Sequence, residues 1–423
     1  MTKMKKSTKF YLALVIFSLV GQVAWVVENM YLNVFIYKMF GASAQQISFM
    51  VAASAVTATV TTLLVGALSD KIGKRKLFIC AGYILWGISI LGFALIRTAW
   101  IGSLSLCISL TVLLDCVMTF FGSSANDAAF NAWLTDATDE TNRGAIEGIN
   151  AMMPLVAILA VFGGFMSLNQ DLQESWTVIF CVIGGVVTAL GIAGFFLIQE
   201  TAVKIEENSR YFANIFYGFR PSVIRANLPL YGTLAVLALF NISIQIFMPY
   251  LILYYQVSLG MENYVLIFAP AIIVAAAFTA VYGKVFDRRG FCFAVIPTLA
   301  MLGIGYVGLI LFRSTFPVFV FSMVMLCGFL GTGAMLGAQI RACTPTNKAG
   351  MFQGLRIVGQ VLIPGVIGPA IGAAILKNAD TITNSDGTTS FVPNANIFFG
   401  AFVALIVTAI ALAPLFKMLK KER

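Results

Sequence analysis

The stretch Gly66-Ala-Leu-Ser-Asp-Lys-Ile-Gly-Lys-Arg75 separates two long apolar runs and combines glycines with one acid and several bases. A second copy, Gly283-Lys-Val-Phe-Asp-Arg-Arg-Gly290, separates two later apolar runs. Glycine allows a tight turn and close helix approach, and Asp70 at a helix end can pair with cations across an interface between helix bundles. The recurrence predicts a chain that is built from two related halves.

The composition around these stretches is that of a membrane protein. The chain is 60% hydrophobic and 11% charged, whereas soluble domains are about 45–50% apolar and about 25% charged. A bilayer core about 30 Å thick requires roughly 20 apolar residues per spanning helix. We predict an all-α membrane protein with twelve transmembrane helices in two pseudo-symmetric six-helix bundles. The expected spans are 11–36, 45–69, 77–96, 101–134, 144–167, 176–199, 228–255, 263–286, 292–312, 316–342, 349–376 and 395–418.

The basic residues define a topology for these spans. Most Lys and Arg residues lie before the first span, in every second loop and after the last span. The positive-inside rule therefore predicts a multi-pass protein of the cytoplasmic membrane with both termini in the cytoplasm. The net charge of +9 reflects this topology, and we expect a monomer in the lipid bilayer without a nucleic-acid partner. Trp100 and Trp176, at outer span ends, are expected at the membrane interface.

The longest cytoplasmic connection divides the chain into near-equal parts. We predict an N-terminal bundle over 1–200, a linker over 201–227 and a C-terminal bundle over 228–423. Aromatic and aliphatic residues at helical spacing in the linker predict an amphipathic helix on the inner membrane surface. Phe121-Gly-Ser-Ser-Ala125 in the fourth span is echoed by Leu330-Gly-Thr-Gly-Ala334 in the tenth. The repeat therefore extends into the spans themselves.

The sequence lacks the residue patterns that disulfide, metal and nucleotide chemistry require. The chain has seven cysteines without a C-x-x-C pair and has no histidine, so we expect neither a disulfide framework nor a metal site. The phosphate-binding loop G-x-x-x-x-G-K-[ST] is missing, which indicates transport driven by a gradient and not by a nucleotide. We expect a protein that is not an enzyme, with no catalytic residue, no metal and no cofactor.

Gly66 to Arg75 resembles the G-x-x-x-D-[RK]-x-G-[RK]-[RK] loop of the major facilitator superfamily, and the resemblance covers the whole chain. It implies a cytoplasmic gate that closes in the outward-open state. Arg143 and Glu147, one helical turn apart, are further expected gate contacts. The full gate set is Gly66, Asp70, Gly73, Arg75, Arg143, Glu147, Gly283, Asp287 and Arg288.

A second resemblance concerns the fourth span. Asp127-Ala-Ala-Phe-Asn131, followed by Leu134, Thr138 and Arg143, is similar to the D-x-x-[FY]-W…L…T…R stretch of the melibiose permease-like glycoside–pentoside–hexuronide cation symporters. It implies that Asp127 serves both the sugar and the coupling cation. Asn131 replaces the tryptophan of that family, and the second span lacks a carboxylate. The coupling ion therefore stays open between H⁺ and Na⁺.

Polar residues inside the apolar runs are the candidates for binding solute or cation. Charges inside a bilayer are costly and usually face a cavity. A bend at Gly122-Ser123-Ser124 in the fourth span is expected to set the depth of Asp127. Arg356 is expected to be buried, as a solute contact or counter-ion. The candidates are Gln22, Trp25, Glu28, Asn29, Asp115, Asp127, Asn131, Asn241, Gln245, Arg356 and Gln360.

These features indicate a secondary active transporter of a small polar solute, a saccharide or glycoside, by cation symport with alternating access. One alternative is a proton-coupled drug or metabolite efflux antiporter, although the G-P-x-x-G-G element of such antiporters is missing from the fifth span. Another alternative is a non-transporting membrane sensor on the same scaffold. A cavity lined by Asn, Gln, Trp and acids favours sugar, whereas a Met- and Phe-rich cavity favours drugs.

Overall fold

The computed structural model describes residues 8–137, 143–200, 217–344, 354–383 and 389–421. The predicted amphipathic linker helix falls mainly on residues 201–216, which lie outside the described residues. Eleven described helices are long and apolar enough to span a membrane, and Met152–Phe165 is a shorter apolar helix. The chain is an all-α membrane protein, as predicted.

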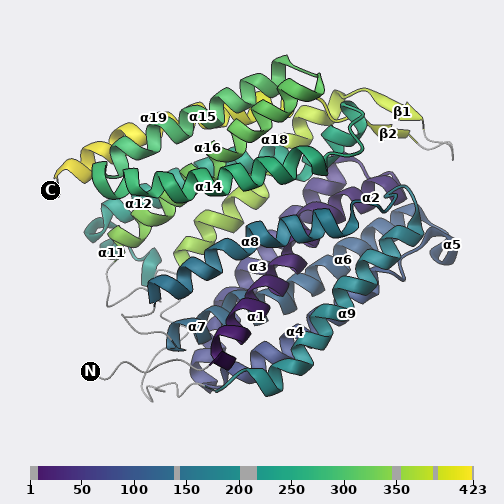
Figure 1. Ribbon diagram of the computed structural model, residues 1–423, viewed down its shortest axis with the longest axis horizontal. Helices are drawn as coiled ribbons and strands as arrows, with labels where there is room; N and C mark the ends of the chain where they lie inside the picture. The colour runs from purple at the N-terminus through teal and green to yellow at the C-terminus, as the bar shows by residue number, and fades with distance from the viewer. Residues whose placement is uncertain (1–7, 138–142, 201–216, 345–353, 384–388, 422–423) are drawn as a thin grey trace. The chain divides into compact units, whose positions relative to one another are not determined.

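The helices follow the predicted spans closely (Figure 1). In the first half they are α1 Thr8–Val26, η1 Val27–Tyr31 and α2 Leu32–Phe40, then α3 Ala44–Ile72, α4 Arg75–Phe93, α5 Thr98–Ile101, α6 Leu104–Gly122, η2 Ser123–Phe130, α7 Asn131–Ala137, α8 Arg143–Phe165 and α9 Gln173–Leu197. In the second half they are η3 Tyr217–Phe219, α11 Pro221–Ala226, α12 Leu228–Phe247, η4 Met248–Tyr250, α13 Leu251–Leu253, η5 Tyr254–Ser258, α14 Val265–Arg289, α15 Phe291–Leu311, α16 Thr315–Cys343, η7 Val358–Leu362, α18 Ile363–Ile375, η8 Leu376–Asn378 and α19 Asn396–Lys421.

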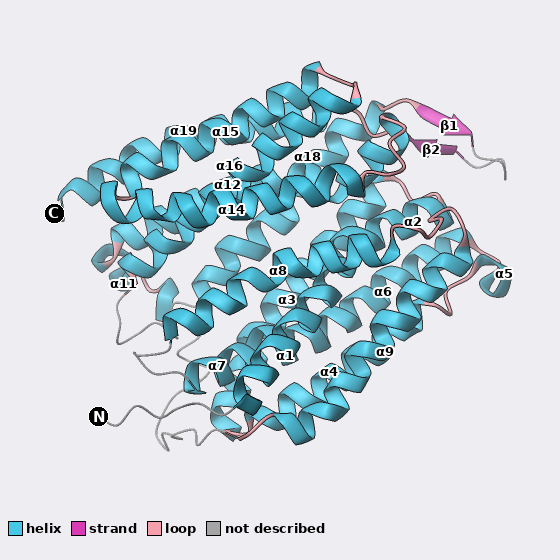
Figure 2. Cartoon of the chain, viewed as in Figure 1, coloured by secondary structure: helices cyan, strands magenta, loops and turns pink. Residues whose placement is uncertain are grey.

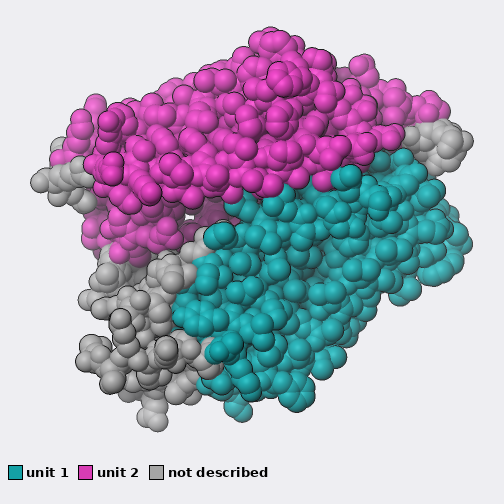
Figure 3. Space-filling view, viewed as in Figure 1, with its two compact units in different colours: residues 1–42, 56–215 teal, residues 43–55, 216–423 magenta. Residues whose placement is uncertain are grey.

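The chain forms two compact units, which Figure 3 colours separately. Unit 1 comprises residues 1–42 and 56–215, and unit 2 comprises residues 43–55 and 216–423, so α3 begins in unit 2 and ends in unit 1. Within unit 1, α4 packs against α6 and α9, and α1 packs against α8 and α9. Within unit 2, α15 packs against α16 and α19, and α12 packs against α18 and α19. The same pairing of spans in each unit agrees with the internal repeat.

Two glycines of the repeated loop have the same unusual backbone. Gly73 has φ +71° and Gly290 has φ +77°, a region that non-glycine residues rarely adopt. Gly73 also donates its backbone N–H to the Ser69 carbonyl at 2.9 Å and so ends α3. The glycines at the start of the two copies, Gly66 and Gly283, have no described atom within 4 Å of an added Cβ. These two glycines therefore make no close helix contact with the described residues.

Gly73→Ala is expected to destabilise unit 1 by about 1–2 kcal/mol, the cost of forcing an L-residue into the left-handed region. Gly66→Ala is the matched control, because its added methyl group meets nothing and its backbone is helical. Thermal unfolding of the two purified variants checks this difference. Equal melting temperatures would contradict it.

Two further elements were not predicted. A hairpin of β1 Thr381–Thr383 and β2 Thr389–Phe391 lies between the last two spans, with antiparallel pairing of Thr381 and Phe391 (Figure 2). The short helix α5 precedes α6 and contains Trp100, which is 64% exposed. Trp176 is fully buried and donates its indole N–H to the Gln170 carbonyl at 2.8 Å. The Trp176 ring therefore packs inside unit 1, although it lies at a span end as predicted.

Candidate functional site

Glu28, Asn29 and Asp127 of unit 1 lie where the regular α-helix is interrupted. The π segment η1 contains Glu28 and Asn29, and the π segment η2 contains Asp127. Such segments insert an extra residue into a turn and are frequent at functional sites. The π segment η2 begins at Ser123, within the Gly122-Ser123-Ser124 stretch where a bend was expected, and π segments are a known cause of helix bending. Helix η2 therefore changes the rotational phase of the fourth span on either side of Asp127.

Two carboxylates lie together where the first span meets the fourth. Glu28 is 8% exposed and Asp115 is 1% exposed. The Thr119 hydroxyl, one turn beyond Asp115 on α6, donates a hydrogen bond to Glu28 Oε1 at 3.0 Å. Asp115 lies one turn from Thr119 on the same helix, so both residues are on the side of α6 that faces Glu28. The sequence identified both acids as candidates but not that they form one pair.

Asn126, Tyr83 and two tryptophans form a network of hydrogen bonds and ring contacts between the first, third and fourth spans. Asn126 on η2 donates to the Tyr83 hydroxyl at 2.7 Å, and that hydroxyl donates to the Phe17 carbonyl at 2.8 Å. The Trp25 indole N–H donates to Asn126 Oδ1 at 3.4 Å, and the Trp25 ring lies 4.9 Å from that of Trp86. This network fixes η2 against the first and third spans. Sequence reasoning missed Asn126 and Tyr83, which lie beside predicted residues without a spacing signal of their own.

The Asp127 carboxylate contacts Ser123, on the same π segment. Its Oδ2 accepts a hydrogen bond from the Ser123 hydroxyl at 3.0 Å. Asn131, at the start of α7, donates to the Asp127 backbone carbonyl at 3.2 Å. The Asp127 and Asn131 side chains are partly accessible, in contrast with the buried Asp115. The fourth span therefore carries one buried acid and one accessible acid.

The first span presents an accessible polar side as well. Gln22 and Trp25 are partly exposed, and Asn29 is exposed. Asn29 donates to the Trp25 backbone carbonyl at 2.8 Å, and Asn33 donates to the Asn29 carbonyl at 3.0 Å. These residues follow one another around successive turns. The accessible side of this helix therefore includes Gln22, Trp25 and Asn29, whereas Asn33 is buried.

Unit 2 contributes amides and one guanidinium. Asn241 and Gln245 on α12 are partly exposed, and Gly368 approaches the Gln245 backbone closely. Arg356 donates to Gln360 Oε1 at 3.2 Å and is partly exposed, so its expected burial is wrong. In the described spanning helices of unit 2, the acid is Asp287, at the exposed end of α14.

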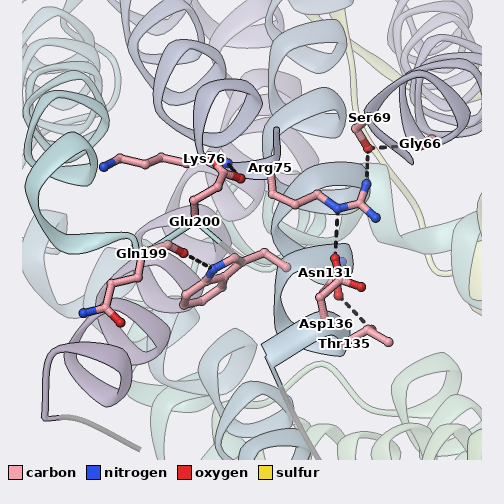
Figure 4. Close-up of polar contacts among 10 residues, drawn as sticks. Gly66, Ser69, Arg75, Lys76, Asn131, Thr135, Asp136, Gln199 and Glu200 are labelled. Atoms are coloured by element: carbon pink, nitrogen blue, oxygen red, sulfur yellow. Dashed lines mark hydrogen bonds and ion pairs between the residues drawn. The ribbon is translucent and has the colours of Figure 1, made fainter. Parts of the chain in front are cut away.

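The predicted gate loop forms a compact cluster inside unit 1 (Figure 4). Arg75 is 3% exposed and makes an ion pair with Asp136 at 3.0 Å between Nε and Oδ2. The Arg75 guanidinium also donates to Ser69 Oγ at 2.6 Å, and Ser69 Oγ donates to the Gly66 carbonyl at 3.0 Å. Sequence reasoning identified Arg75 but missed Asp136 at the end of α7.

Two more hydrogen bonds join this cluster to the end of the sixth span. Trp133 donates its indole N–H to the Gln199 carbonyl at 2.9 Å, and the Lys76 backbone N–H donates to Glu200 at 3.3 Å. Both acceptors lie immediately before the linker. The cluster therefore connects the loop after α3, the end of the fourth span and the last described residues before the linker.

The remaining charged residues of the predicted gate fall into two groups. The side chains of Asp70, Arg143 and Glu147 lie outside the described residues. Asp287 and Arg288 are exposed at the end of α14. Among the residues that the structure describes, no three His, Cys, Asp or Glu side chains are grouped so that they could hold a metal ion.

The sequence model of the Major Facilitator Superfamily matches residues 11–369. The chain belongs to this superfamily. It is a multi-pass membrane transporter, and the Gly66–Arg75 loop occupies the position that the superfamily resemblance implies. A search of curated proteins found no match.

Solved structures share this superfamily fold at low sequence identity. The chain is similar to a D-xylose-proton symporter, with a TM-score of 0.75, 12% identity and coverage of 95% of this chain and 96% of that chain. It is similar to a mutant of the nucleoside transporter NupG, with a TM-score of 0.73, 13% identity and coverage of 96% and 99%. It is also similar to a bacterial homologue of the human lysosomal transporter Spinster, with a TM-score of 0.75, 15% identity and 99% coverage of both chains. At these identities the similarity establishes the fold alone.

Proposed function

We propose that this superfamily member moves a small polar solute, a saccharide or glycoside, across the cytoplasmic membrane by cation symport with alternating access. One observation carries the proposal. Polar side chains of unit 1, including Trp25, Asn29 and Asp127, are accessible within spanning helices. Exposure of such groups to lipid is unfavourable, so they are expected to line a water-filled pathway.

The chemistry of these groups suits a sugar. Amide and carboxylate groups accept and donate hydrogen bonds to hydroxyls, and an aromatic ring offers an apolar face to a sugar ring. Trp25 combines such a face with an indole held by Asn126 at 3.4 Å. A drug pathway would be expected to present mainly Met and Phe at these positions. The accessible residues of unit 1 favour the polar solute.

Transport into reconstituted vesicles tests the proposal. Labelled monosaccharides, glycosides and nucleosides are supplied with an imposed pH or Na⁺ gradient, and the solute inside is counted. Nucleosides are included because one structural neighbour is a nucleoside transporter. We expect uphill accumulation of at least one sugar-containing solute. Movement of a dye or drug, without accumulation of any of these solutes, would refute the saccharide assignment.

Asp127→Asn is expected to weaken solute binding by about tenfold or more. The loss of a charged hydrogen-bond acceptor costs about 1.5–3 kcal/mol. Ser123→Ala is the control, because it removes the hydrogen bond to Asp127 Oδ2 and leaves the carboxylate in place. The concentration dependence of solute uptake measures both variants. An unchanged half-saturating concentration in Asp127→Asn would remove Asp127 from the solute site.

A further inference from the structure

Arg289 lies against Phe293 at the turn between α14 and α15, two spanning helices of unit 2. Its guanidinium carbon is 4.6 Å from the centre of the Phe293 ring. Among the described residues, the exposed Arg289 guanidinium donates no hydrogen bond and forms no ion pair. A guanidinium carries five N–H donors in a fork that matches a phosphate or a carboxylate. The donors of Arg289 are therefore available to a ligand from outside the chain.

Two other described arginines stack on aromatic rings, and both use their donors within the chain. Arg97 lies 4.9 Å from a tryptophan ring and donates to the Thr177 hydroxyl at 2.7 Å. Arg313 lies 6.0 Å from a tyrosine ring and donates to the Leu309 carbonyl at 2.9 Å. Internal hydrogen bonds account for the positions of these two arginines, whereas Arg289 is held by its ring contact.

Phe293 is the first residue of an exposed apolar stripe along α15. The members of this stripe recur at helical spacing and are Phe293, Ile296, Ile304, Val307 and Leu311. A continuous exposed apolar surface on a spanning helix is expected to contact lipid. The stripe runs from the Arg289 end of α15 to the opposite end, which is the path that an acyl chain follows.

Hydrogen bonds fix the turn that carries Arg289. Gly290 has φ +77°, and its N–H donates to the Phe286 carbonyl at 2.8 Å. The Tyr282 hydroxyl donates to the Ala294 carbonyl at 3.2 Å and so joins α14 to α15. A side chain on a fixed backbone loses less conformational freedom when it binds a ligand. The turn and the ring therefore preorganise the Arg289 guanidinium.

The repeat shows that internal packing does not require this arginine. When the two loop copies are aligned on Gly73 and Gly290, Arg289 falls opposite Ile72. Cys292 falls opposite Arg75, which makes the buried ion pair of unit 1. The second copy therefore has an exposed arginine at the position of an apolar residue and no arginine at the position of the buried one.

Other basic residues lie at the same end of unit 2. The Phe291 and Phe416 rings are 6.1 Å apart, which brings the end of α19 beside the start of α15. Asp287 is an exposed acid at the end of α14. The exposed bases on α14 and α19 outnumber it and are Lys284, Arg288, Lys417 and Lys420. Positive charge at a membrane surface attracts anionic lipids.

We propose that Arg289 and Phe293 bind the headgroup of an anionic phospholipid whose acyl chains lie along the exposed stripe of α15. The phosphate oxygens accept the paired N–H groups of the guanidinium. The ring holds the charge at the edge of the apolar surface, with the arginine stem along that surface. The residues of this site take no part in the proposed solute pathway, so the site does not rest on the proposed function.

Fluorescence quenching by brominated lipids tests the site in the full-length protein. Phe293→Trp places an indole there and retains an aromatic face for Arg289, and the signal of the native tryptophans is subtracted. The protein is reconstituted in phosphatidylcholine with increasing brominated phosphatidylglycerol, and quenching gives the relative binding constant of the two lipids. We expect phosphatidylglycerol to be favoured by about fivefold or more, the effect of one positive charge near a membrane surface. No preference would overturn the proposal.

Two variants separate this site from diffuse attraction to a basic surface. Arg289→Gln in the Phe293→Trp protein is expected to abolish most of the preference. Arg288→Gln removes the same charge from a neighbouring exposed side chain, and should lower the preference less than about twofold, because an unstacked side chain loses more rotamer freedom on binding. An equal loss in both variants would overturn the proposal.

A probe at the other end of the stripe tests its location. Leu311 belongs to the same stripe and is 67% exposed. Leu311→Trp should therefore contact lipid as Phe293→Trp does, but without a preference for phosphatidylglycerol. An equal preference at both ends of α15 would overturn the assignment to Arg289.

Inorganic phosphate distinguishes a lipid from a soluble anion. Millimolar phosphate should leave the quenching of Phe293→Trp unchanged, because burial of the acyl chains supplies most of the binding energy of a lipid. Sodium chloride at the same ionic strength controls for screening. Loss of quenching with phosphate and not with chloride would assign the site to a soluble anion and overturn the lipid proposal.

Discussion

Arg75→Ala is expected to lower the free energy of unfolding by about 3 kcal/mol. Removing one partner of a buried ion pair leaves the other charge without compensation, which typically costs 3–5 kcal/mol. The Arg75 side chain is 4% exposed and that of Asp136 is 26% exposed, so water relieves part of the cost and the lower end of the range applies. Thermal unfolding can be followed with a thiol-reactive dye in a Cys181→Ser background, because Cys80 and Cys107 are buried whereas Cys181 is exposed.

An ion pair whose carboxylate is exposed provides the control. Lys38 lies 2.8 Å from Asp171, whose side chain is 69% exposed, and Lys38→Ala should cost at most about 1 kcal/mol. The double variant Arg75→Ala/Asp136→Ala should recover part of the loss caused by Arg75→Ala alone, because no uncompensated carboxylate remains. If Arg75→Ala and Lys38→Ala have the same small effect, the buried cluster does not stabilise unit 1.

Gly184→Ala is expected to destabilise unit 1 by about 1–3 kcal/mol through overpacking. A Cβ atom at Gly184 would lie 2.8 Å from the Gly87 carbonyl oxygen and 2.9 Å from the Leu91 backbone nitrogen. Both obstacles are backbone atoms of α4, so α4 and α9 would have to separate. Small residues at such contacts are what allow transmembrane helices to approach closely.

Gly185→Ala is the matched control for this substitution. The two glycines are neighbours on α9, but an added Cβ at Gly185 meets no atom within 4 Å. The change in helix propensity is the same for both variants, so their difference in melting temperature reports packing alone. A Gly184→Ala protein as stable as Gly185→Ala would show that α4 and α9 do not pack as described.

The fold was predictable because it depends mainly on features that extend over many residues of the sequence. Apolar runs and the sidedness of Lys and Arg identified the spans, and the repeated loop identified the two halves. The glycine that makes the loop turn, Gly73, was also visible in the motif. The π segments were not visible, because an extra residue in one turn leaves the composition and apolar character of a span unchanged.

The sequence identified candidate residues for the site but not the contacts between them. Glu28 and Asp115 were chosen because an acid in an apolar run is rare, but nothing in their spacing shows that they meet. Asp136 was missed because it follows a span and resembles an ordinary loop acid. The burial of Trp176 was missed for a similar reason, since a tryptophan at a span end has the same local sequence whether it faces lipid or the core.

If the coupling ion of the proposed symport is a proton, entry of the solute changes the pH outside the vesicles. The direct measurement is the external pH of a weakly buffered suspension of reconstituted vesicles, recorded as a sugar identified by the uptake screen is added. The account predicts that the medium becomes more alkaline as protons enter with the solute. Solute entry without a pH change, or with acidification of the medium, would contradict proton symport.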